Sequence, residues 1–375
     1  MTDRILGWAP RGRIAILLTS IAALIAVAGL AAAGCGDDDP GDATTAESSG
    51  ADLAAVKDYL TEHTADLSEH VAALRAHGES YYELAESVDF DYERLMDQHG
   101  DEVAKLLDAS KQAFRKANPA YEEMEGIVAG VPRLAQYDVD IDAGSDASDP
   151  ESAVSFSLER PDGGTLKQPG NLFFVVETSL FGTNPDFLGK GVDQDVDGDG
   201  KEEFGEGIPD ASIYVAAVRE FEKQAESLDA DAHEFEPTPS DAFTALTIMT
   251  PTMSEYFEAW KNSRFIAGED ATELAFVAAS RLSDIADILE GLVFTYEEIE
   301  PLVAAESTQQ AEQTRTQLAG LLAYVEDLRD TEASGHEYTA EQADTLGAEA
   351  QRRAEAIAGQ VTQAAQRLEI ELQEA

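Results

Sequence analysis

The stretch LAAVKDYLTEHTADLSEHVAAL, residues 53–74, decides the fold class of this chain. Its apolar side chains recur at intervals of three, four and seven residues, and the pattern continues through Tyr81, Leu84 and Val88. The stripe begins with Leu53, Val56, Leu60, Leu67, Val71 and Leu74. Such spacing places apolar residues on one face of an α-helix and leaves the other face polar. The stretch therefore predicts a long amphipathic helix that starts near Asp52 and packs in a bundle.

Most of the sequence that follows repeats this helical pattern. Further helices are predicted over 91–117, 121–128, 171–181, 209–228, 240–265, 271–292, 299–330 and 339–374. The pair Asn118-Pro119 is expected to end the second helix, because the residue before a proline avoids the helical conformation. Pro237 and Pro239 divide the helices into two sets. We therefore predict an all-α protein of two antiparallel bundles, over 52–236 and 240–375.

The first bundle is predicted to carry an irregular insertion over 137–210. Asp, Gly, Ser and Pro interrupt residues 137–170, where no helical stripe survives and a small hairpin pairs 153–158 with 165–167. Residues 186–210 are again rich in Gly and Asp and are expected to form a loop. The insertion therefore adds a small hairpin and a long loop to a helical protein.

Cys35 is the only cysteine of the chain, and it follows a segment typical of secretion. Arginines precede an apolar run over 14–33, and Leu30-Ala-Ala-Ala-Gly34 stands directly before Cys35. A basic start, an apolar stretch and small residues at the cut site predict a lipoprotein signal peptide over 1–34. Cys35 would then bind membrane lipid, and a flexible acidic tether over 35–51 would hold the protein outside the cytoplasm, in the periplasm or at the cell surface. The apolar run is also long enough for an uncleaved membrane anchor.

The chain is strongly acidic, with 75 Asp and Glu against 25 Lys and Arg, and its formal net charge is −50. This charge argues against nucleic acid as a partner, because phosphate binding needs lysine and arginine. Two interpretations of the charge stay open. It suits a halophilic protein, since salt screens the self-repulsion, and it also raises the local concentration of cations.

Residues 195–206, DVDGDGKEEFGE, match the spacing of a calcium-binding loop. Carboxylates occupy positions one, three, five and twelve, and glycine occupies position six, where the chain must reverse. The predicted Ca²⁺ ligands are Asp195, Asp197, Asp199, Lys201 through its backbone carbonyl, Glu203 and Glu206. The flanks are rich in glycine, so we predict a lone structural calcium loop rather than a sensor pair. The alternative is an acidic turn that binds no ion.

His63, His70 and His77 recur every seven residues along the first predicted helix. Seven residues rise about 10 Å at 1.5 Å per residue, so one ion cannot bind two of these histidines. A single histidine could join carboxylates of a facing helix as a metal ligand. The simpler interpretation places all three at the margin of the apolar stripe.

Acidic residues in the middle of the chain are candidate ligands of a second metal. The predicted set is Glu125, Asp138, Asp142 and Glu177. Glu177 stands out because it lies inside the apolar run 171–182, where an unpaired buried charge is very costly. It needs either a metal or a compensating partner, such as an arginine or backbone amides.

These residues also carry a family resemblance. Tyr121-Glu-Glu-Met-Glu125, the Asp138–Asp142 pair and the Glu177 segment ending in Leu-Phe-Gly182 resemble the imelysin-like family. Three further segments resemble the EfeO-type and EfeM-type members of this family, which lack a cupredoxin domain. They are Tyr81-Tyr-Glu-Leu-Ala85, Phe90-Asp-Tyr92 and Tyr256-Phe-Glu-Ala-Trp-Lys261. The resemblance implies two helical bundles outside the cytoplasm and a role in uptake of iron or another metal. An iron permease or a peroxidase-type protein is then the expected partner.

The chain departs from the family signature Gly-x-His-x-x-Glu. Glu177 matches the glutamate, but Leu172 and Phe174 replace the glycine and the histidine, and a phenyl ring cannot bind a metal. The site is then either rebuilt from carboxylates, which favours ferric iron or manganese over zinc or copper, or lost. No catalytic motif such as Gly-x-Ser-x-Gly or His-Glu-x-x-His occurs. We therefore predict a non-enzymatic metal-binding accessory lipoprotein, and as the alternative a calcium-stabilised surface scaffold with a degenerate metal site.

Overall fold

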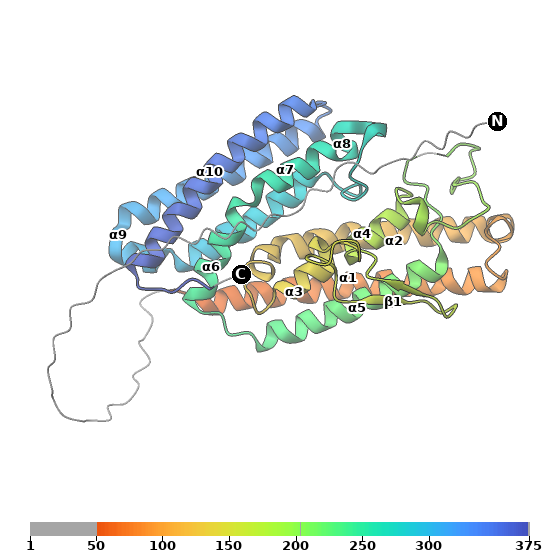
Figure 1. Cartoon of the computed structure of the whole chain (residues 1–375), viewed down its shortest axis with the longest axis horizontal. Helices are drawn as coiled ribbons and strands as arrows, with labels where there is room; N and C mark the ends of the chain where they lie inside the picture. The colour runs from red at the N-terminus through yellow and green to blue at the C-terminus, as the bar shows by residue number, and fades with distance from the viewer. Residues whose placement is uncertain (1–50, 203, 374–375) are drawn as a thin grey trace, which may run out of the picture. The chain divides into compact units, whose positions relative to one another are not determined.

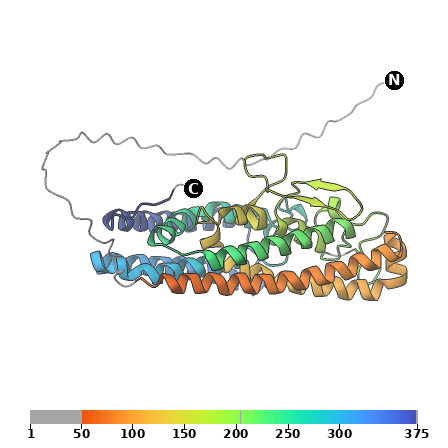
Figure 2. The ribbon, with the colours of Figure 1, turned by 90° about the horizontal axis from the view of Figure 1, so that it is seen from below.

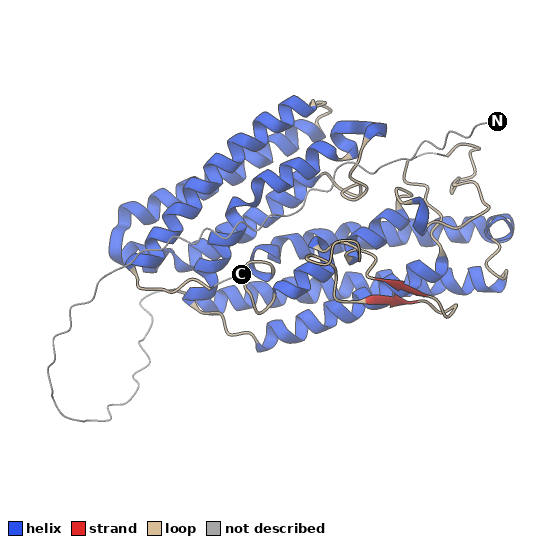
Figure 3. Ribbon diagram, viewed as in Figure 1, coloured by secondary structure: helices blue, strands red, loops and turns tan. Residues whose placement is uncertain are grey.

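The computed structural model describes residues 51–202 and 204–373, which are mostly helical (Figure 1, Figure 3). The predicted signal peptide, Cys35 and nearly all of the tether lie outside the described residues, and so does Glu203. Within the described ranges, no helix is both long enough and apolar enough to cross a membrane. The predicted all-α class and two-bundle arrangement are confirmed.

The first bundle consists of α1 (Leu53–Ser87), α2 (Tyr92–Val128), α4 (Leu172–Leu180) and α5 (Ala211–Glu234). The carboxylate of Asp52 caps α1 by accepting the backbone N–H of Ala55. Buried residues of α1 recur every three or four positions from Val56 to Ala85, as the opening stretch predicts. This face packs against α2 and α5, and Figure 2 shows α5 lying along α1.

The predicted stop at Asn118-Pro119 is wrong, because α2 continues through Pro119 to Val128. A proline inside a helix costs about 3 kcal/mol through its lost hydrogen bond and its ring clash. Nearly every residue from Ala120 to Val128 is buried. Burial of this last part of α2 between the two bundles outweighs the local preference, and it carries Glu122 and Glu125 into the interior.

The second bundle consists of α6 (Pro239–Met249), α7 (Met253–Asn262), α9 (Arg281–Ala333) and α10 (Ala340–Arg367). Its core is formed by apolar residues between Ala242 and Ala365. The short elements η3 (Thr250–Thr252), α8 (Arg264–Ala267) and η4 (Gly268–Asp270) connect α6, α7 and α9.

All four helix predictions in this half need correction. The helix predicted over 240–265 is interrupted at Pro251, which has non-helical φ and ψ angles, and again at Ser263. Residues 271–280 are not helical, and α9 starts only at Arg281 and then joins the two helices predicted over 271–292 and 299–330, with a kink at Ser307. α10 ends at Arg367, short of residue 374.

The insertion in the first bundle is partly regular. It begins with α3 (Ala135–Asp138) and η1, a π-helix (Val139–Ala143), where an irregular chain was predicted. Buried Ile141 anchors this turn, and the carboxylate of Asp140 accepts the N–H of Ser155 at 2.7 Å. β1 (Ser157–Glu159) and β2 (Thr165–Lys167) pair antiparallel, with Leu158 opposite Leu166, and η2 (Pro185–Phe187) follows α4. The predicted hairpin exists, but its first strand lies nearer the turn than 153–158.

Two glycines let α2 and α9 approach each other where the bundles meet. A Cβ atom on Gly291 would lie 2.1 Å from the carbonyl oxygen of Glu123, and one on Gly126 would lie 2.8 Å from the side chain of Leu292. A side chain at Gly291 would require the backbone of a helix to move, and one at Gly126 would displace the side chain of Leu292. This close crossing sets the acidic residues of α2 against the start of α9.

Candidate metal centre

Ionisable side chains gather in the interior where α2, α3, η1 and the start of α9 meet. They are Glu122 and Glu125 of α2, Asp138 of α3, Asp142 of η1, and Arg281 and Asp284 of α9. All except Asp138 are less than a tenth exposed. These residues fall into three pairs along the chain, Glu122 with Glu125, Asp138 with Asp142, and Arg281 with Asp284. The two members of each pair are three or four residues apart, so they project from the same side of their helix. We call the five acidic residues the carboxylate cluster.

Arg281 is the cation of this cluster. Its Nη1 atom lies 3.2 Å from Oδ2 of Asp284 and 3.4 Å from Oε1 of Glu122, and its Nη2 atom lies 3.5 Å from Oδ2 of Asp142. Asn118 adds neutral donors, 3.0 Å from Glu122 and 3.2 Å from Asp284. Five carboxyl groups therefore share one guanidinium among the described residues, which leaves an excess of negative charge if all five ionise.

The pKa values of four of these acids are raised, which is the direction that such an excess demands. Burial raises the pKa of Glu122 and of Asp138 well above the usual range, and neighbouring carboxylates raise both further. Burial also raises the pKa of Asp142 to about 7, although Arg281 opposes the shift. The pKa of Asp284 is raised for the same reason. Without another cation, protons must compensate part of the charge.

Three members of the cluster are arranged so that one ion could contact all of them. Glu122, Glu125 and Asp142 each offer a carboxylate oxygen, and these oxygens lie within 4.8 Å of one another. The Oε2 atoms of Glu122 and Glu125 are buried and have no hydrogen-bond partner among the described residues. Unpaired buried oxygens of ionisable groups are costly. A hard cation would satisfy them, because carboxylate oxygens suit such ions.

Two buried tyrosines border the same cluster. Tyr256 of α7 donates its hydroxyl proton to Oε1 of Glu125 at 2.7 Å, and Tyr121 of α2 donates to Oδ1 of Asp138 at 2.8 Å. The guanidinium carbon of Arg281 lies 4.7 Å from the ring centroid of Tyr256. One phenol oxygen is thus placed beside Glu125, a member of the group of three, and the other beside Asp138.

Glu177 occupies a different environment from the other predicted ligands. Its carboxylate accepts backbone N–H groups of Phe276, Val277 and Ala278 at 2.7, 2.9 and 2.7 Å. Burial nevertheless raises its pKa to about 7, against the opposing effect of these amides. This is the compensation by backbone amides that the sequence left open. The structure brings Glu125, Asp138 and Asp142 together with Glu122, whereas it engages Glu177 with the 271–280 segment. Phe174, at the place of the family's histidine, packs against Phe187.

Asp195, Asp197 and Asp199 form a second, exposed group in the loop before α5. Each offers an oxygen within 4.8 Å of the others. Asp195 accepts the N–H groups of Gly198 and Gly200, both at 2.8 Å, while Asp197 and Asp199 each accept the N–H two residues further on, at 3.0 and 2.9 Å. Gly200, at the position where a calcium loop turns, has φ 89°. The loop thus follows the predicted reversal.

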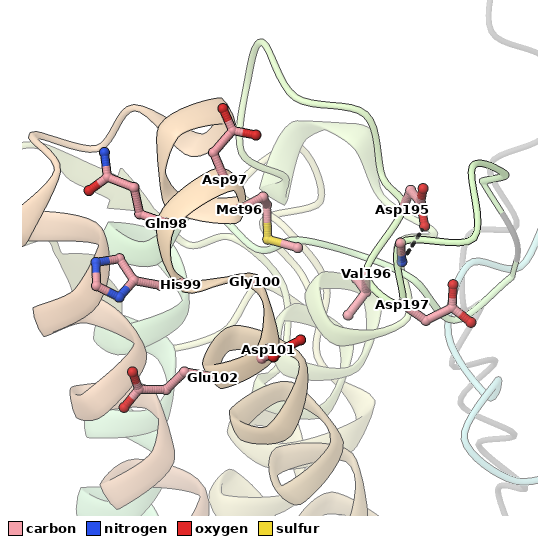
Figure 4. Close-up of a pocket in the computed structure, with 11 residues that line it drawn as sticks. Met96, Asp97, Gln98, His99, Gly100, Asp101, Glu102, Asp195, Val196 and Asp197 are labelled. Atoms are coloured by element: carbon pink, nitrogen blue, oxygen red, sulfur yellow. Dashed lines mark hydrogen bonds between the residues drawn. The ribbon is translucent and has the colours of Figure 1, made fainter.

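Of the other three predicted calcium ligands, the structure describes Lys201 and Glu206. The Nζ atom of Lys201 lies 2.7 Å from Oδ2 of Asp199, and Oε1 of Glu206 accepts the N–H of Asp197 at 3.4 Å. Glu203 lies outside the described residues. A cavity of about 600 Å³ separates the loop from residues 96–102 of α2. Figure 4 shows Asp195 and Asp197 on one side of it, and His99, Asp101 and Glu102 on the other.

The three heptad-spaced histidines lie at the margin of the apolar stripe of α1, where each is half-buried. Of these, His63 contacts Glu123 through Nε2, and its Nδ1 lies 2.7 Å from the carbonyl oxygen of Tyr59. Its nearest acidic neighbour therefore lies next to the carboxylate cluster along α2, outside the group of three oxygens.

The ligand set predicted from the sequence did not include Glu122, Arg281, Asp284 or Tyr256. The sequence interpretation placed Arg281 and Asp284 in the interior of a helix over 271–292, although α9 begins at Arg281. A signal was available, because Arg281 and Asp284 fall in phase with Ile285, Ile288 and Leu292 on the buried face. Charged residues in an apolar stripe indicate a buried ion pair or a site.

Comparison with known proteins places this architecture in a family. A family model described as imelysin, Peptidase M75, matches residues 52–368. No curated protein matches the chain. The match covers both bundles and includes every residue of the carboxylate cluster. It also includes Asp195, Asp197 and Asp199, whose loop we call the aspartate loop.

Proposed function

The chain belongs to the imelysin family, and from that premise we propose that it is a metal-binding accessory protein for the uptake of iron or a similar ion, held outside the cytoplasm by lipid on Cys35. Its cargo site is the group Glu122, Glu125 and Asp142. An iron permease or a peroxidase-type protein receives or supplies the metal, as in the EfeO-like role that the sequence resembles.

One observation carries this proposal: the buried excess of carboxylates over cations around Arg281. Two carboxylate oxygens there have no partner among the described residues, and three converge to within 4.8 Å. A purely structural cluster would gain nothing from such a charge imbalance, because removing charge from an interior is favourable. A donor set of carboxylates suits ferric iron or manganese better than zinc or copper.

The family is named for a peptidase, but we propose a role in binding rather than catalysis. The family signature contributes a histidine, and Phe174 stands at that position. Metal-assisted hydrolysis also needs an open coordination position and a base for water. The carboxylate cluster instead contains acids with raised pKa values, among them Glu122 and Asp138, and such acids can exchange their protons for a cation.

Metal binding by the mature chain tests the proposal. Calorimetric titration with Mn²⁺ after chelator treatment should show a site whose affinity Glu125→Gln lowers by at least about tenfold. Even residues that only hydrogen-bond a metal ligand change the affinity by about tenfold or more when they are mutated. Glu123→Gln is the matched control, because Glu123 is the next-but-one residue of α2 and contacts His63 instead. Equal binding by wild type and Glu125→Gln would contradict the site. Metal analysis of protein purified without chelator would identify the natural ion.

Glu177→Gln tests whether Glu177, which was predicted from the sequence as a ligand, takes part in metal binding by the carboxylate cluster. The three amide hydrogen bonds of Glu177 argue that this substitution leaves Mn²⁺ affinity nearly unchanged. A loss equal to that of Glu125→Gln would return Glu177 to the list of ligands.

A second candidate function is a calcium-stabilised surface scaffold. The three aspartate oxygens in the 195–199 loop favour it, together with the turn at Gly200. Calorimetry with Ca²⁺ should then reveal one site that the double variant Asp195→Ala, Glu206→Ala abolishes. Unchanged binding in that variant would contradict the loop as a calcium site. Calcium binding without any Glu125-dependent metal binding would favour the scaffold.

A further inference from the structure

The three residues that would hold the ion are closed to solvent in this structure. Glu122, Glu125 and Asp142 are 0%, 3% and 7% exposed. A hydrated cation cannot reach oxygens buried to this extent unless a neighbouring part of the fold moves aside. Entry and release of a metal ion therefore require a local opening of the protein.

The segment 271–280, which leads into α9, forms part of the cover of the carboxylate cluster. Its Phe276 is half-buried, and the centre of the Phe276 ring lies 4.2 Å from the guanidinium carbon of Arg281, which is only 4% exposed. A partly exposed ring that lies against a buried charge separates that charge from water. Arg281 in turn contacts Glu122 and Asp142. The Phe276 side chain thus lies on the solvent side of the cluster.

One side chain holds the middle of this segment in place. The carboxylate of Glu177, on α4, accepts the backbone N–H groups of residues 276–278 at 2.7, 2.9 and 2.7 Å. In a helix each N–H has its own carbonyl acceptor, whereas here three donors depend on a single carboxylate. In addition, Thr183 donates to the carbonyl oxygen of Leu274 at 2.7 Å, and Arg115 donates to that of residue 278 at 3.4 Å. Loss of the Glu177 carboxylate would therefore release three backbone donors at once.

The backbone at Phe276 is strained in this closed arrangement. Its φ angle is 54°, in the left-handed region that residues with a β-carbon adopt only at a cost. Strain of this kind persists where the surrounding contacts impose it, and here the bonds to Glu177 are such contacts. Release of the segment would relax the backbone, so the strain favours opening and the Glu177 bonds oppose it.

We propose that metal ions enter and leave the carboxylate cluster past residues 275–278, and that Glu177 is a positioning residue that holds this segment closed. The inference rests on the proposed function, because it concerns access to the same site. Glu177 does not bind the ion but sets how readily the segment opens. Weaker bonds to the segment should therefore speed uptake and release by the same factor and leave the affinity nearly unchanged.

The kinetics of Mn²⁺ exchange test this proposal. Release is measured by mixing the loaded protein with an excess of a chromogenic chelator, and uptake by the loss of the EPR signal of free Mn²⁺ after rapid mixing. Glu177→Gln weakens the three amide hydrogen bonds and should speed both steps by at least about fivefold. The dissociation constant should change by less than about threefold, because the substitution leaves the three ion-binding carboxylates in place.

Glu273→Gln is the matched control, because Glu273 lies on the same segment and accepts the N–H groups of Leu274 and Ala275 at 3.0 and 3.2 Å. Those bonds lie within the segment and do not join it to α4, so both rates should change by less than about threefold. Tyr81→Phe removes a buried hydrogen bond to Pro209 elsewhere in the first bundle. It controls for a general loss of stability, and its exchange rates should match those of wild type.

Amide hydrogen exchange gives a readout that needs no metal. In the metal-free chain, Glu177→Gln should speed the exchange of residues 276–278 by at least about fivefold. The interior of α9 should change little, since only the segment opens. An increase spread equally over α9 would indicate global unfolding and would overturn the local opening.

The outcomes separate this inference from the proposed function. Unchanged uptake and release in Glu177→Gln, with Glu125-dependent binding retained, would overturn the entry route and leave the metal site intact. A loss of Mn²⁺ affinity equal to that of Glu125→Gln would also overturn it, because Glu177 would then be a ligand. Absence of any Glu125-dependent binding would overturn the proposed function and the entry route with it.

Discussion

The carboxylate cluster and the aspartate loop look alike in composition but differ in how their charge is compensated. Both bring three carboxylate oxygens within 4.8 Å of one another. In the loop, Asp195, Asp197 and Asp199 accept backbone N–H groups from the loop itself, and water reaches them. In the cluster, Glu122 and Glu125 each keep a buried oxygen without a partner in the described chain.

This difference indicates at which of the two groups a bound cation would change the stability and protonation of the protein. Coulomb interactions are strong in a buried site and weak at a hydrated surface. The buried cluster must hold protons or a cation, so an ion there changes stability and protonation together. The loop is compensated without an ion, so calcium there would add to a structure already formed. Each prediction below tests one part of this contrast.

The largest effect is expected from Arg281→Met. Removing the guanidinium group that contacts three acids of the cluster leaves uncompensated buried charge, which costs about 3–5 kcal/mol of unfolding free energy. Urea unfolding of the chelator-treated protein at pH 8 measures it. Arg352→Met is the control, because Arg352 is exposed and pairs with Glu349 at the surface, and its change should stay within about 0.5 kcal/mol. Equal stability of Arg281→Met and wild type would break the contrast.

The second effect concerns pH. The folded-state pKa of Asp142 is raised to about 7 from 3.8. The folded protein therefore binds a proton more tightly than the unfolded chain, and this contribution is full below about pH 4 and is lost as pH rises to about 7. Each pKa unit corresponds to about 1.4 kcal/mol, so stability of the metal-free chain should fall by a few kcal/mol across this window.

Urea midpoints between pH 4.5 and pH 8 check this slope. Asp142→Asn should flatten it, whereas Asp199→Asn in the loop should leave it unchanged. Saturating Mn²⁺ should also flatten it if the ion replaces the protons. A slope that Asp142→Asn does not alter would mean that the fall in stability comes from the net charge of −50 rather than from the cluster.

The third effect compares two carboxylates that both accept backbone N–H groups. Glu177 accepts three in the interior, and Asp195 accepts two at the surface. Glu177→Gln places an amide group against those donors and should destabilise the protein by about 1–3 kcal/mol. Asp195→Asn should cost less than about 0.5 kcal/mol. Similar losses in both variants would show that burial does not control the effect.

The periodic parts of the fold could be predicted from the sequence. The spacing from Leu53 to Leu74 identifies α1 and its buried face, and the calcium-type spacing finds the aspartate group. These features depend on neighbours along the chain. The predicted stop at Pro119 is wrong because burial of the following turns exceeds the local cost of proline, which the local sequence does not reveal.

The site was harder to predict because its partners come from distant segments. Glu125, Asp138 and Asp142 were selected as candidates, and the fold does bring them together. Arg281 and Tyr256 lie more than a hundred residues away and enter the cluster only through the crossing of α2 with the second bundle. The role of Glu177 turns on the 271–280 segment, whose non-helical path the apolar pattern did not indicate.

The smallest effect is expected in the loop itself. Asp199→Asn removes one exposed charge whose visible partners are the N–H and Nζ atoms of Lys201. An exposed ion pair contributes between about 0 and 1 kcal/mol, and asparagine can still accept the N–H bond, so stability in chelator should change by less than about 0.5 kcal/mol. With Ca²⁺ at 100 times its dissociation constant, wild type should gain about 2.7 kcal/mol, and the variant should gain less. A loss above about 1 kcal/mol in chelator would mean that Asp199 stabilises the loop without an ion, and the loop would then resemble the buried cluster more than its exposure implies.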